Sequence, residues 1–219
     1  MTTVVAIYTG QGLAEPLKVV FNEAIPDVRL VNIIDDSLIA DVISSRKVTT
    51  DVTRRLLRYY EIAAEMGADV ILNTCSSVGE VVALGRKVVD VPIVRIDEPM
   101  AVEAVTRYDR IGVIATLPST LQPTLRLLRE QAAQAGRSVT LIEGLADGAY
   151  KALVNGAPEQ HDQLILDTAL RLKPQVDCLV LAQGSMARME RKLADVTGLP
   201  VLSSPRLGVA EVKRILAGE

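Results

Sequence analysis

The chain has 219 residues, enough to bury a sizeable core in one large domain or in two halves of about 100 residues each. Its composition is 49% hydrophobic, with one Phe and no Trp, which suits parallel strands covered by helices. The net charge of −3 argues against a nucleic-acid partner or an anionic membrane surface, and no apolar stretch approaches the roughly 20 residues that span a bilayer.

The N-terminus and the cysteines narrow the class of protein further. Met1-Thr2-Thr3 runs directly into a predicted strand without a basic region, so we expect no signal peptide and a cytoplasmic location. The two cysteines have neither CxxC nor CxxH spacing, which predicts neither a zinc site nor a disulfide framework.

Strand-like and helix-like runs alternate along the first half of the chain. The helix over 50–66 is amphipathic, and its predicted buried face is Val52, Leu56, Tyr59, Ile62 and Ala63. The predicted strands are 4–9, 28–34, 69–74 and 92–96, and further helices are predicted from Pro16 and over 78–88.

The second half follows the same order of elements. Its predicted strands are 110–116, 138–142, 177–182 and 200–203, and its predicted helices are 123–135, 159–172 and 186–196. An insertion over 143–157 carries three glycines, which suggests a mobile cover over a site. A last helix over 208–216 lies outside the repeat, and we expect it to pack on the first half.

Short connections with right-handed crossovers favour parallel sheets. We therefore predict an α/β fold of two pseudosymmetric, Rossmann-like or flavodoxin-like lobes with an active-site cleft between them. Lobe 1 is predicted over 1–98, with the C-terminal helix 206–219 returning to it, and lobe 2 over 99–205.

The two halves repeat at their strand ends. Thr9 ends the first strand and Thr116 ends its counterpart, and the interval from Thr9 to Cys75 nearly equals the interval from Thr116 to Gln183. Cys75 and Gln183 are each followed, at the same spacing, by a proline that opens a short apolar run. The repeat therefore has a thiol in one half where the other half has an amide.

Ligands of open parallel sheets bind beyond the carboxyl ends of the strands. If the halves face each other, those ends form one cleft, whose hydroxyls, N–H groups and helix N-termini suit a small carboxylate. Cys75 and Gln183 are the predicted catalytic positions. The predicted substrate-binding residues are Thr9, Gln11, Asn73, Thr74, Ser76, Ser77, Thr116, Ser119, Thr120, Gly184 and Ser185.

Cys75 is the candidate reactive group. Ser77 and Glu80 match the S-x-x-E capping box, which predicts a helix start two residues beyond the thiol. A helix N-terminus favours the thiolate, so we predict a lowered pKa for Cys75. A free cysteine is also commonly a small buried hydrophobe, and this alternative stays open for Cys75. Cys178 falls in mid-strand and is interpreted as a core residue.

The segment Asn73-Thr74-Cys75-Ser76-Ser77, followed at the corresponding strand end of the second half by Gln183-Gly184-Ser185, resembles the aspartate/glutamate/hydantoin racemase superfamily. That superfamily also contains maleate isomerase and arylmalonate decarboxylase. The resemblance covers essentially the whole chain. It implies a small carboxylate substrate, a homo-oligomer, and no pyridoxal phosphate, metal or nucleotide. In such racemases one cysteine thiolate removes the α-proton and a second thiol returns one to the opposite face.

Gln183 departs from that pattern, because an amide neither gives nor takes a proton near neutral pH. We expect Gln183 instead to orient the substrate or to donate a hydrogen bond to enolate charge. The sequence predicts a racemase-like isomerase with Cys75 as base or nucleophile and enediolate stabilisation by the hydroxyl-rich loops. The alternatives are a decarboxylase or lyase with Cys75 as its single proton donor, an isomerase in which Cys75 adds to a double bond, and a vestigial carboxylate-binding protein.

Three other signals are interpreted as structural. Gly10-Gln11-Gly12 begins like a dinucleotide fingerprint, but Glu15 replaces the last glycine and we expect no NAD. The acidic pairs Asp35-Asp36 and Asp97-Glu98 are interpreted as helix caps and solvated turns, and the alternative that they line the cleft stays open. His161, the only histidine, is predicted to be solvated on a surface helix.

Overall fold

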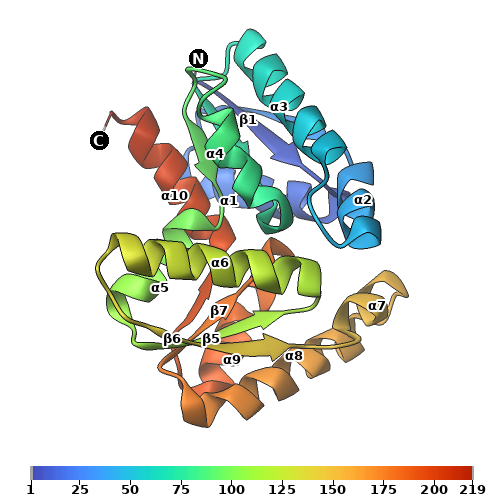
Figure 1. Cartoon of the computed structure of the whole chain (residues 1–219), viewed down its shortest axis with the longest axis vertical. Helices are drawn as coiled ribbons and strands as arrows, with labels where there is room; N and C mark the ends of the chain where they lie inside the picture. The colour runs from blue at the N-terminus through green and yellow to red at the C-terminus, as the bar shows by residue number, and fades with distance from the viewer. Residues whose placement is uncertain (1, 219) are drawn as a thin grey trace. The chain divides into compact units, whose positions relative to one another are not determined.

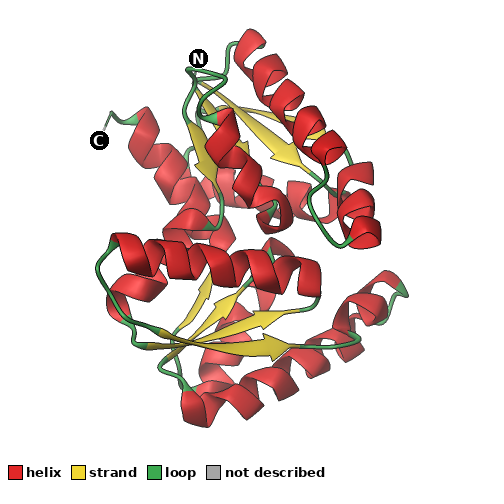
Figure 2. Cartoon of the chain, viewed as in Figure 1, coloured by secondary structure: helices red, strands yellow, loops and turns green. Residues whose placement is uncertain are grey.

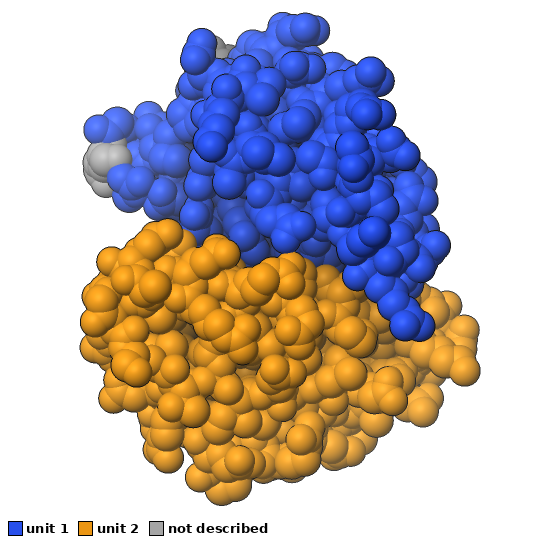
Figure 3. Space-filling model, viewed as in Figure 1, with its two compact units in different colours: residues 1–99, 205–219 blue, residues 100–204 orange. Residues whose placement is uncertain are grey.

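A computed structural model of the chain describes residues 2–218, and the side chain of Gln11 also lies outside the description. The chain divides into two compact units, Met1–Pro99 with Pro205–Glu219 and Met100–Ser204, which Figure 3 shows in two colours. Each unit contains one four-stranded parallel sheet flanked by helices (Figures 1 and 2). This confirms the predicted α/β fold of two pseudosymmetric lobes with parallel sheets.

The sheet of the first unit has the strand order β2-β1-β3-β4. Its strands are β1 (Thr3–Tyr8), β2 (Arg29–Ile34), β3 (Val70–Asn73) and β4 (Ile93–Arg95). Its helices are α1 (Ala14–Ala24), α2 (Ser37–Ser45), α3 (Thr50–Glu65), α4 (Val82–Gly85) and α10 (Ser204–Leu216), with 3₁₀ helices η1 (Gln11–Leu13) and η2 (Ser76–Val81).

The inner strands of this sheet carry the residues that place Cys75. Every residue of β1 and β3 is buried, as expected for apolar runs that are covered on both faces. α2 and α3 supply the core on one face, and α1 and α10 supply it on the other. Asn73 pairs with Ile7 on one side and with Arg95 on the other, so three strand ends converge beside Cys75.

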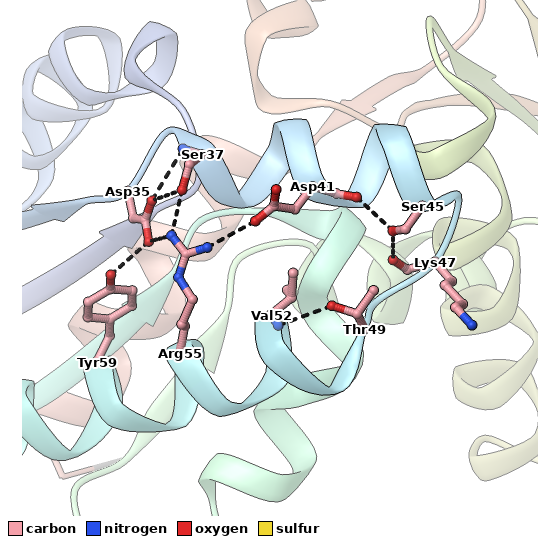
Figure 4. A network of polar contacts seen from close by, with 9 residues as sticks. All are labelled: Asp35, Ser37, Asp41, Ser45, Lys47, Thr49, Val52, Arg55 and Tyr59. Carbon is pink, nitrogen blue, oxygen red and sulfur yellow. Dashed lines mark hydrogen bonds and ion pairs between the residues drawn. The ribbon is translucent and has the colours of Figure 1, made fainter.

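Helix α3 begins as the sequence predicts but buries a slightly different face. The hydroxyl of Thr49 caps it by accepting a hydrogen bond from Val52 N at 3.2 Å (Figure 4). Tyr60 is fully buried, whereas Tyr59 is only partly buried and Ile62 is 43% exposed. The predicted placement of Tyr59 and Ile62 on the buried face was therefore wrong, because the helix turns Tyr60 toward the sheet.

The sheet of the second unit repeats the same order, β6-β5-β7-β8. Its strands are β5 (Arg110–Ala115), β6 (Thr140–Leu145), β7 (Cys178–Leu181) and β8 (Val201–Ser203). The helices are α5 (Glu98–Arg107), α6 (Pro118–Gln134), α7 (Ala149–Val154), α8 (Pro158–Leu172) and α9 (Glu190–Thr197), with 3₁₀ helices η3 (Lys173–Gln175) and η4 (Gly184–Met189).

Several elements differ from those that the sequence predicts. The segment predicted as an insertion forms the end of β6 and the short helix α7. Helices α2 and α5 were not predicted, and the segments after Cys75 and Gln183 begin as 3₁₀ rather than α-helices. Within residues 2–218, no helix combines the length and the apolar character that crossing a bilayer requires.

Candidate active site

Cys75 lies two residues beyond the end of β3, at the point where the chain leaves the sheet for η2. Its backbone is extended, with φ −120° and ψ 116°, and it occupies the N-cap position of η2. The side chain is partly buried and packs against the hydrophobic core between the sheet and α3. Cys75 thus contacts the core without being sealed inside it.

Three hydrogen-bond donors favour the ionised form of the Cys75 thiol. They are the hydroxyl of Thr9, at the end of β1, and the backbone N–H groups of Ser77 and Val78 in η2. Burial nevertheless outweighs them and raises the pKa of the Cys75 thiol, and the negative charge of Asp97 adds to the rise. The predicted lowering of this pKa was therefore wrong in its net direction, although the donors lie where the helix N-terminus was expected to supply them.

Asn73 and Thr74 hold the Cys75 segment from inside the unit. The Tyr60 hydroxyl donates to Asn73 Oδ1 at 3.1 Å, and Asn73 Nδ2 donates to the Cys75 carbonyl at 3.1 Å. Thr74 Oγ1 donates to the carbonyl of Ile7 at 3.0 Å, tying the end of β3 to β1. These buried side chains have protein partners, and their predicted contact with a substrate stays a prediction.

The two serines after Cys75 are buried at the start of η2. Ser77 is the second residue of this 3₁₀ helix, so it does not take the N-cap position that the capping box predicts. Ser77 N–H instead contributes to the thiol environment. The predicted role of Gln11 falls on a side chain outside the described ones.

Gln183 occupies the matching position in the second unit and is bound to the residue that matches Thr9. The backbone N–H of Thr116 donates to Gln183 Oε1 at 2.8 Å, and Gln183 Nε2 donates to Thr116 Oγ1 at 2.6 Å. The same strand ends therefore carry a Thr9–Cys75 pair in one unit and a Thr116–Gln183 pair in the other. The amide makes both contacts within its own unit.

The remaining predicted residues of the second unit lie around these strand ends. Ser119 and Thr120 are in the first turn of α6, and Gly184 and Ser185 begin η4. The Ser119 hydroxyl is buried and has no hydrogen-bond partner within residues 2–218. Such a group is available to a ligand. That the loops of the two units face each other across a cleft stays a prediction.

The second cysteine is a structural residue, as predicted. Cys178 is the first residue of β7 and is fully buried among the strands. Burial, with a smaller contribution from Asp177, raises the pKa of its thiol to about 12. Cys178 is thus an internal reference for an unreactive thiol in the same chain.

The prediction of a solvated His161 was wrong. The side chain is 1% exposed, and its Nδ1 lies 2.8 Å from Asp162 Oδ1. Arg188, in η4, contacts both carboxylate oxygens of Asp162, at 2.5 and 2.6 Å. The helix that carries His161 turns this ring inward, and the neighbouring ion pair covers it at the surface.

Asp35 belongs to a polar network that joins α2 to α3 (Figure 4). Its carboxylate accepts hydrogen bonds from the Ser37 hydroxyl at 2.7 Å, from the Tyr59 hydroxyl at 2.7 Å and from Arg55. Partial burial raises the pKa of this carboxyl, but the three donors together hold it below its usual range. Asp35 Oδ1 also accepts a hydrogen bond from Ser37 N at 3.2 Å at the start of α2, in agreement with the predicted capping role. Asp35 therefore fastens two helices together, and the prediction of a solvated turn was wrong.

The sequence interpretation missed a buried ion pair beside Cys75. Arg95 Nε lies 2.7 Å from Asp97 Oδ1, and the two residues are 7% and 0% exposed. A signal was present, because a charged residue within the buried strand Ile93–Arg95 requires a partner of opposite charge. Asp97 was instead interpreted as part of a solvated turn.

Comparison with known proteins supports one family. The model of the Asp/Glu/Hydantoin racemase family matches residues 9–212. The fold is similar to that of glutamate racemase isoform RacE1 from Bacillus anthracis, with a TM-score of 0.79, 16% identity, and coverage of 99% of this chain and 82% of that one. It is also similar to allantoin racemase from Klebsiella pneumoniae, with a TM-score of 0.72, 15% identity, and coverage of 99% and 88%.

A third similar structure is a glycine-to-cysteine mutant of arylmalonate decarboxylase, with a TM-score of 0.58, 17% identity, and coverage of 99% of this chain and 94% of that one. A comparison with curated proteins finds no match. At these identities the structures establish the fold alone. The family match, which spans nearly the whole chain, shows that the chain belongs to the Asp/Glu/hydantoin racemase family.

Proposed function

We propose that the protein is an isomerase of the racemase type that acts on a small carboxylate without a cofactor, with Cys75 as its proton-transferring group. The observation that carries the proposal is that the Thr9 hydroxyl and the Ser77 and Val78 N–H groups all favour the thiolate of one partly buried cysteine. Family membership supports the reaction class. Amino acids, hydroxy acids and related compounds are the candidate substrates.

In the proposed reaction the Cys75 thiolate takes the proton from the carbon next to the substrate carboxylate. The C–H bond breaks, the S–H bond forms, and the electron pair moves onto the carboxylate as an enediolate. The three donors stabilise the thiolate before transfer. The hydroxyls of Ser76, Ser77 and Ser119 are the proposed donors to the enediolate.

Return of the proton to the opposite face needs a carrier other than Gln183. An amide does not exchange a proton near neutral pH, and this one is bound at both ends to Thr116. Water or an acidic residue is the proposed second carrier. Racemisation by this route is expected to be slow or to favour one enantiomer.

A second candidate is a lyase in which Cys75 protonates one face of a carbanion after loss of carbon dioxide. The raised pKa of the Cys75 thiol favours this candidate, because burial keeps the proton on sulfur near neutral pH. Protonation from a single face also requires nothing of Gln183. The two candidates differ in which form of Cys75 enters the reaction.

The experiment is a panel of small carboxylates incubated in deuterium oxide over a range of pH. It includes aspartate, glutamate, 2-hydroxy acids and an arylmalonate, and allantoin is added as a compound that has no carboxylate. Deuterium at the α-carbon of both enantiomers, with a rate that rises as Cys75 ionises, supports the isomerase. Release of carbon dioxide at a rate that falls as the thiol ionises supports the lyase.

The variants Cys75→Ser and Cys178→Ala form a matched pair for this experiment. Cys75→Ser is expected to abolish turnover, and Cys178→Ala to retain it, since Cys178 is a core residue of β7. Turnover that persists in Cys75→Ser would contradict the proposal. Protection of Cys75 from iodoacetamide by a carboxylate that is not turned over would identify a binding protein instead.

A further inference from the structure

The ion pair of Arg95 and Asp97 is buried beside the candidate reactive thiol. Arg95 Nε donates to Asp97 Oδ1 at 2.7 Å, and Arg95 Nη2 donates to Asp97 Oδ2 at 3.1 Å. The two side chains are 7% and 0% exposed. Taking two charges out of water is unfavourable, and a well-packed apolar pair is often as stable. The pair thus calls for a role beyond stability.

Arg95 packs directly on the turn that follows Cys75. A Cβ atom placed on Gly79 would lie 2.3 Å from Arg95 Nε and 2.5 Å from Arg95 Cζ. Only a glycine leaves room for the guanidinium at this point. Gly79 is in η2, one residue after Val78, whose N–H group donates to the Cys75 carbonyl at 3.4 Å and favours the thiolate. The guanidinium therefore rests against the segment that supplies two of the three donors that favour the thiolate.

The same segment is held from its other end. Tyr60 donates to Asn73, and Asn73 donates to the Cys75 carbonyl, each at 3.1 Å. Ile96 N–H donates to the Asn73 carbonyl at 3.0 Å, which joins the end of β4 to the end of β3. Arg95 and Asp97 flank Ile96, so the ion pair and the Cys75 segment are parts of one packed corner of the sheet.

We propose that Arg95 and Asp97 act together to position Cys75. Arg95 fixes the η2 turn that follows Cys75, and each ion cancels the effect of the other's charge on the sulfur. The consequence for catalysis rests on the proposed function. The effect on the thiol itself does not, because it can be measured without a substrate.

The groups that act on Cys75 come from every neighbouring element. Thr9 and the η2 N–H groups favour the thiolate, and Asp97 disfavours it. Tyr60 lies within electrostatic range of both Cys75 and Arg95. Removing one member of the ion pair leaves the other as an uncompensated charge near the sulfur, and the sign of that charge decides the direction of the effect.

The test measures the rate of alkylation of Cys75 by iodoacetamide against pH, with mass spectrometry of the separate tryptic peptides that carry Cys75 and Cys178. Asp97→Asn leaves Arg95 unbalanced, and we expect alkylation near neutral pH to become about tenfold faster. Arg95→Gln leaves Asp97 unbalanced, and we expect alkylation to become about tenfold slower. Loss of structure alone would move both rates in the same direction.

Two further variants separate charge from packing. Arg95→Lys keeps the positive charge but loses the two-bond contact with Asp97 and the packing on Gly79, so its rate is expected to lie between those of the parent and Arg95→Gln. The double variant Arg95→Gln with Asp97→Asn removes both charges, and its rate is expected to return toward that of the parent. Arg110→Gln and Asp177→Asn are the matched controls, because they break an ion pair at the amino ends of β5 and β7. Neither control is expected to change the Cys75 rate.

Equal shifts in the two single variants, or no shift in either, would overturn the proposal. If the single variants do not fold, Gly79→Ala tests the positioning role instead, because its methyl group requires the Arg95 side chain to move. A Cys75 rate that is unchanged in folded Gly79→Ala refutes the positioning role. Failure of the proposed function would appear as absent turnover in the parent, and the alkylation series would remain interpretable.

Discussion

Tyr60→Phe removes one hydroxyl from the base of the Cys75 segment. The Tyr60 ring is fully buried, and its hydroxyl donates to Asn73 Oδ1 at 3.1 Å. Burial raises the pKa of Tyr60, so the hydroxyl stays a donor across the working pH range. Without it, Asn73 Oδ1 is left buried without this donor, which costs about 2 kcal/mol. Asn73 also holds the Cys75 carbonyl, so the loss is transmitted to the thiol.

Tyr59→Phe is the control, because it makes the same chemical change one residue earlier. Its hydroxyl donates to Asp35 at 2.7 Å in a partly exposed network (Figure 4). Asp35 keeps Ser37 and Arg55 as partners, so the cost is expected below about 1 kcal/mol. Only Tyr60→Phe is expected to change the rate at which iodoacetamide reacts with Cys75.

The assay is urea unfolding of the three proteins, followed by alkylation of Cys75. With a slope of about 2 kcal/mol per molar urea, the Tyr60→Phe midpoint is expected to fall by about 1 M. The Tyr59→Phe midpoint is expected to fall by less than about half of that. A Tyr60→Phe variant that is no less stable than Tyr59→Phe, with an unchanged Cys75 rate, would refute the view that the Tyr60–Asn73 contact holds the site.

Three other changes test separate features. Gln183→Cys loses both contacts with Thr116, at about 1–3 kcal/mol. It supplies a second thiol and should make deuterium enter the enantiomer that the parent labels more slowly at a higher rate; a folded variant with the parent's ratio of rates contradicts this. Gly85→Ala is expected to lower the free energy of unfolding by about 1–3 kcal/mol, because the added Cβ would lie 2.5 Å from Tyr60 Cδ2. Gly12→Ala is the control and should leave the free energy of unfolding unchanged, because its Cβ would meet nothing within 4 Å. Because the pKa of Asp35 is lowered in the folded state, its carboxylate stabilises the fold above the unfolded pKa, and this stability is lost as pH falls through the folded pKa. Asp35→Asn should therefore flatten the acid limb of a plot of stability against pH. An unchanged acid limb counts against the network.

The fold was predictable because it depends on patterns that a sequence displays directly. Apolar runs at β1 and β3 and the repeated spacing of strand ends predicted two parallel sheets, and both sheets share one strand order. The position of Cys75 at a strand end followed from the same repeat. These features are local or periodic, so tertiary contacts are not needed to infer them.

The chemistry of Cys75 was only partly predictable. The N–H donors follow from the local sequence, because any helix start supplies them. Burial is a tertiary property, and it reverses the net direction of the pKa shift. The choice between Tyr59 and Tyr60 as the core residue likewise depends on the rotation of α3 against the sheet. Residues one position apart in a helix differ by about 100° around its axis, which an amphipathic pattern with mixed aromatics does not resolve.

The buried ion pair was missed for a related reason. Arg95 falls at the end of a short strand, where a charged side chain commonly reaches solvent. Its burial results from Gly79, which is distant from Arg95 in sequence and leaves space for the guanidinium. The apolar run before Arg95 signals that the strand is buried and that Arg95 needs a partner of opposite charge, but the space that Gly79 provides leaves no periodic trace in the sequence.

The first unit is assembled from two segments that the whole second unit separates in the chain. Val209 and Val212 of α10 belong to the core that β1, β3 and α1 form, and a Cβ on Gly208 would lie 2.7 Å from Ile96 Cγ1. During synthesis on the ribosome, Met100–Ser204 is therefore complete before the segment that precedes it can finish folding. A nascent chain that stops short of α10 would leave one apolar face of the earlier sheet open to chaperones or to aggregation. Closure of the half that carries the thiol therefore waits for α10 to be synthesised.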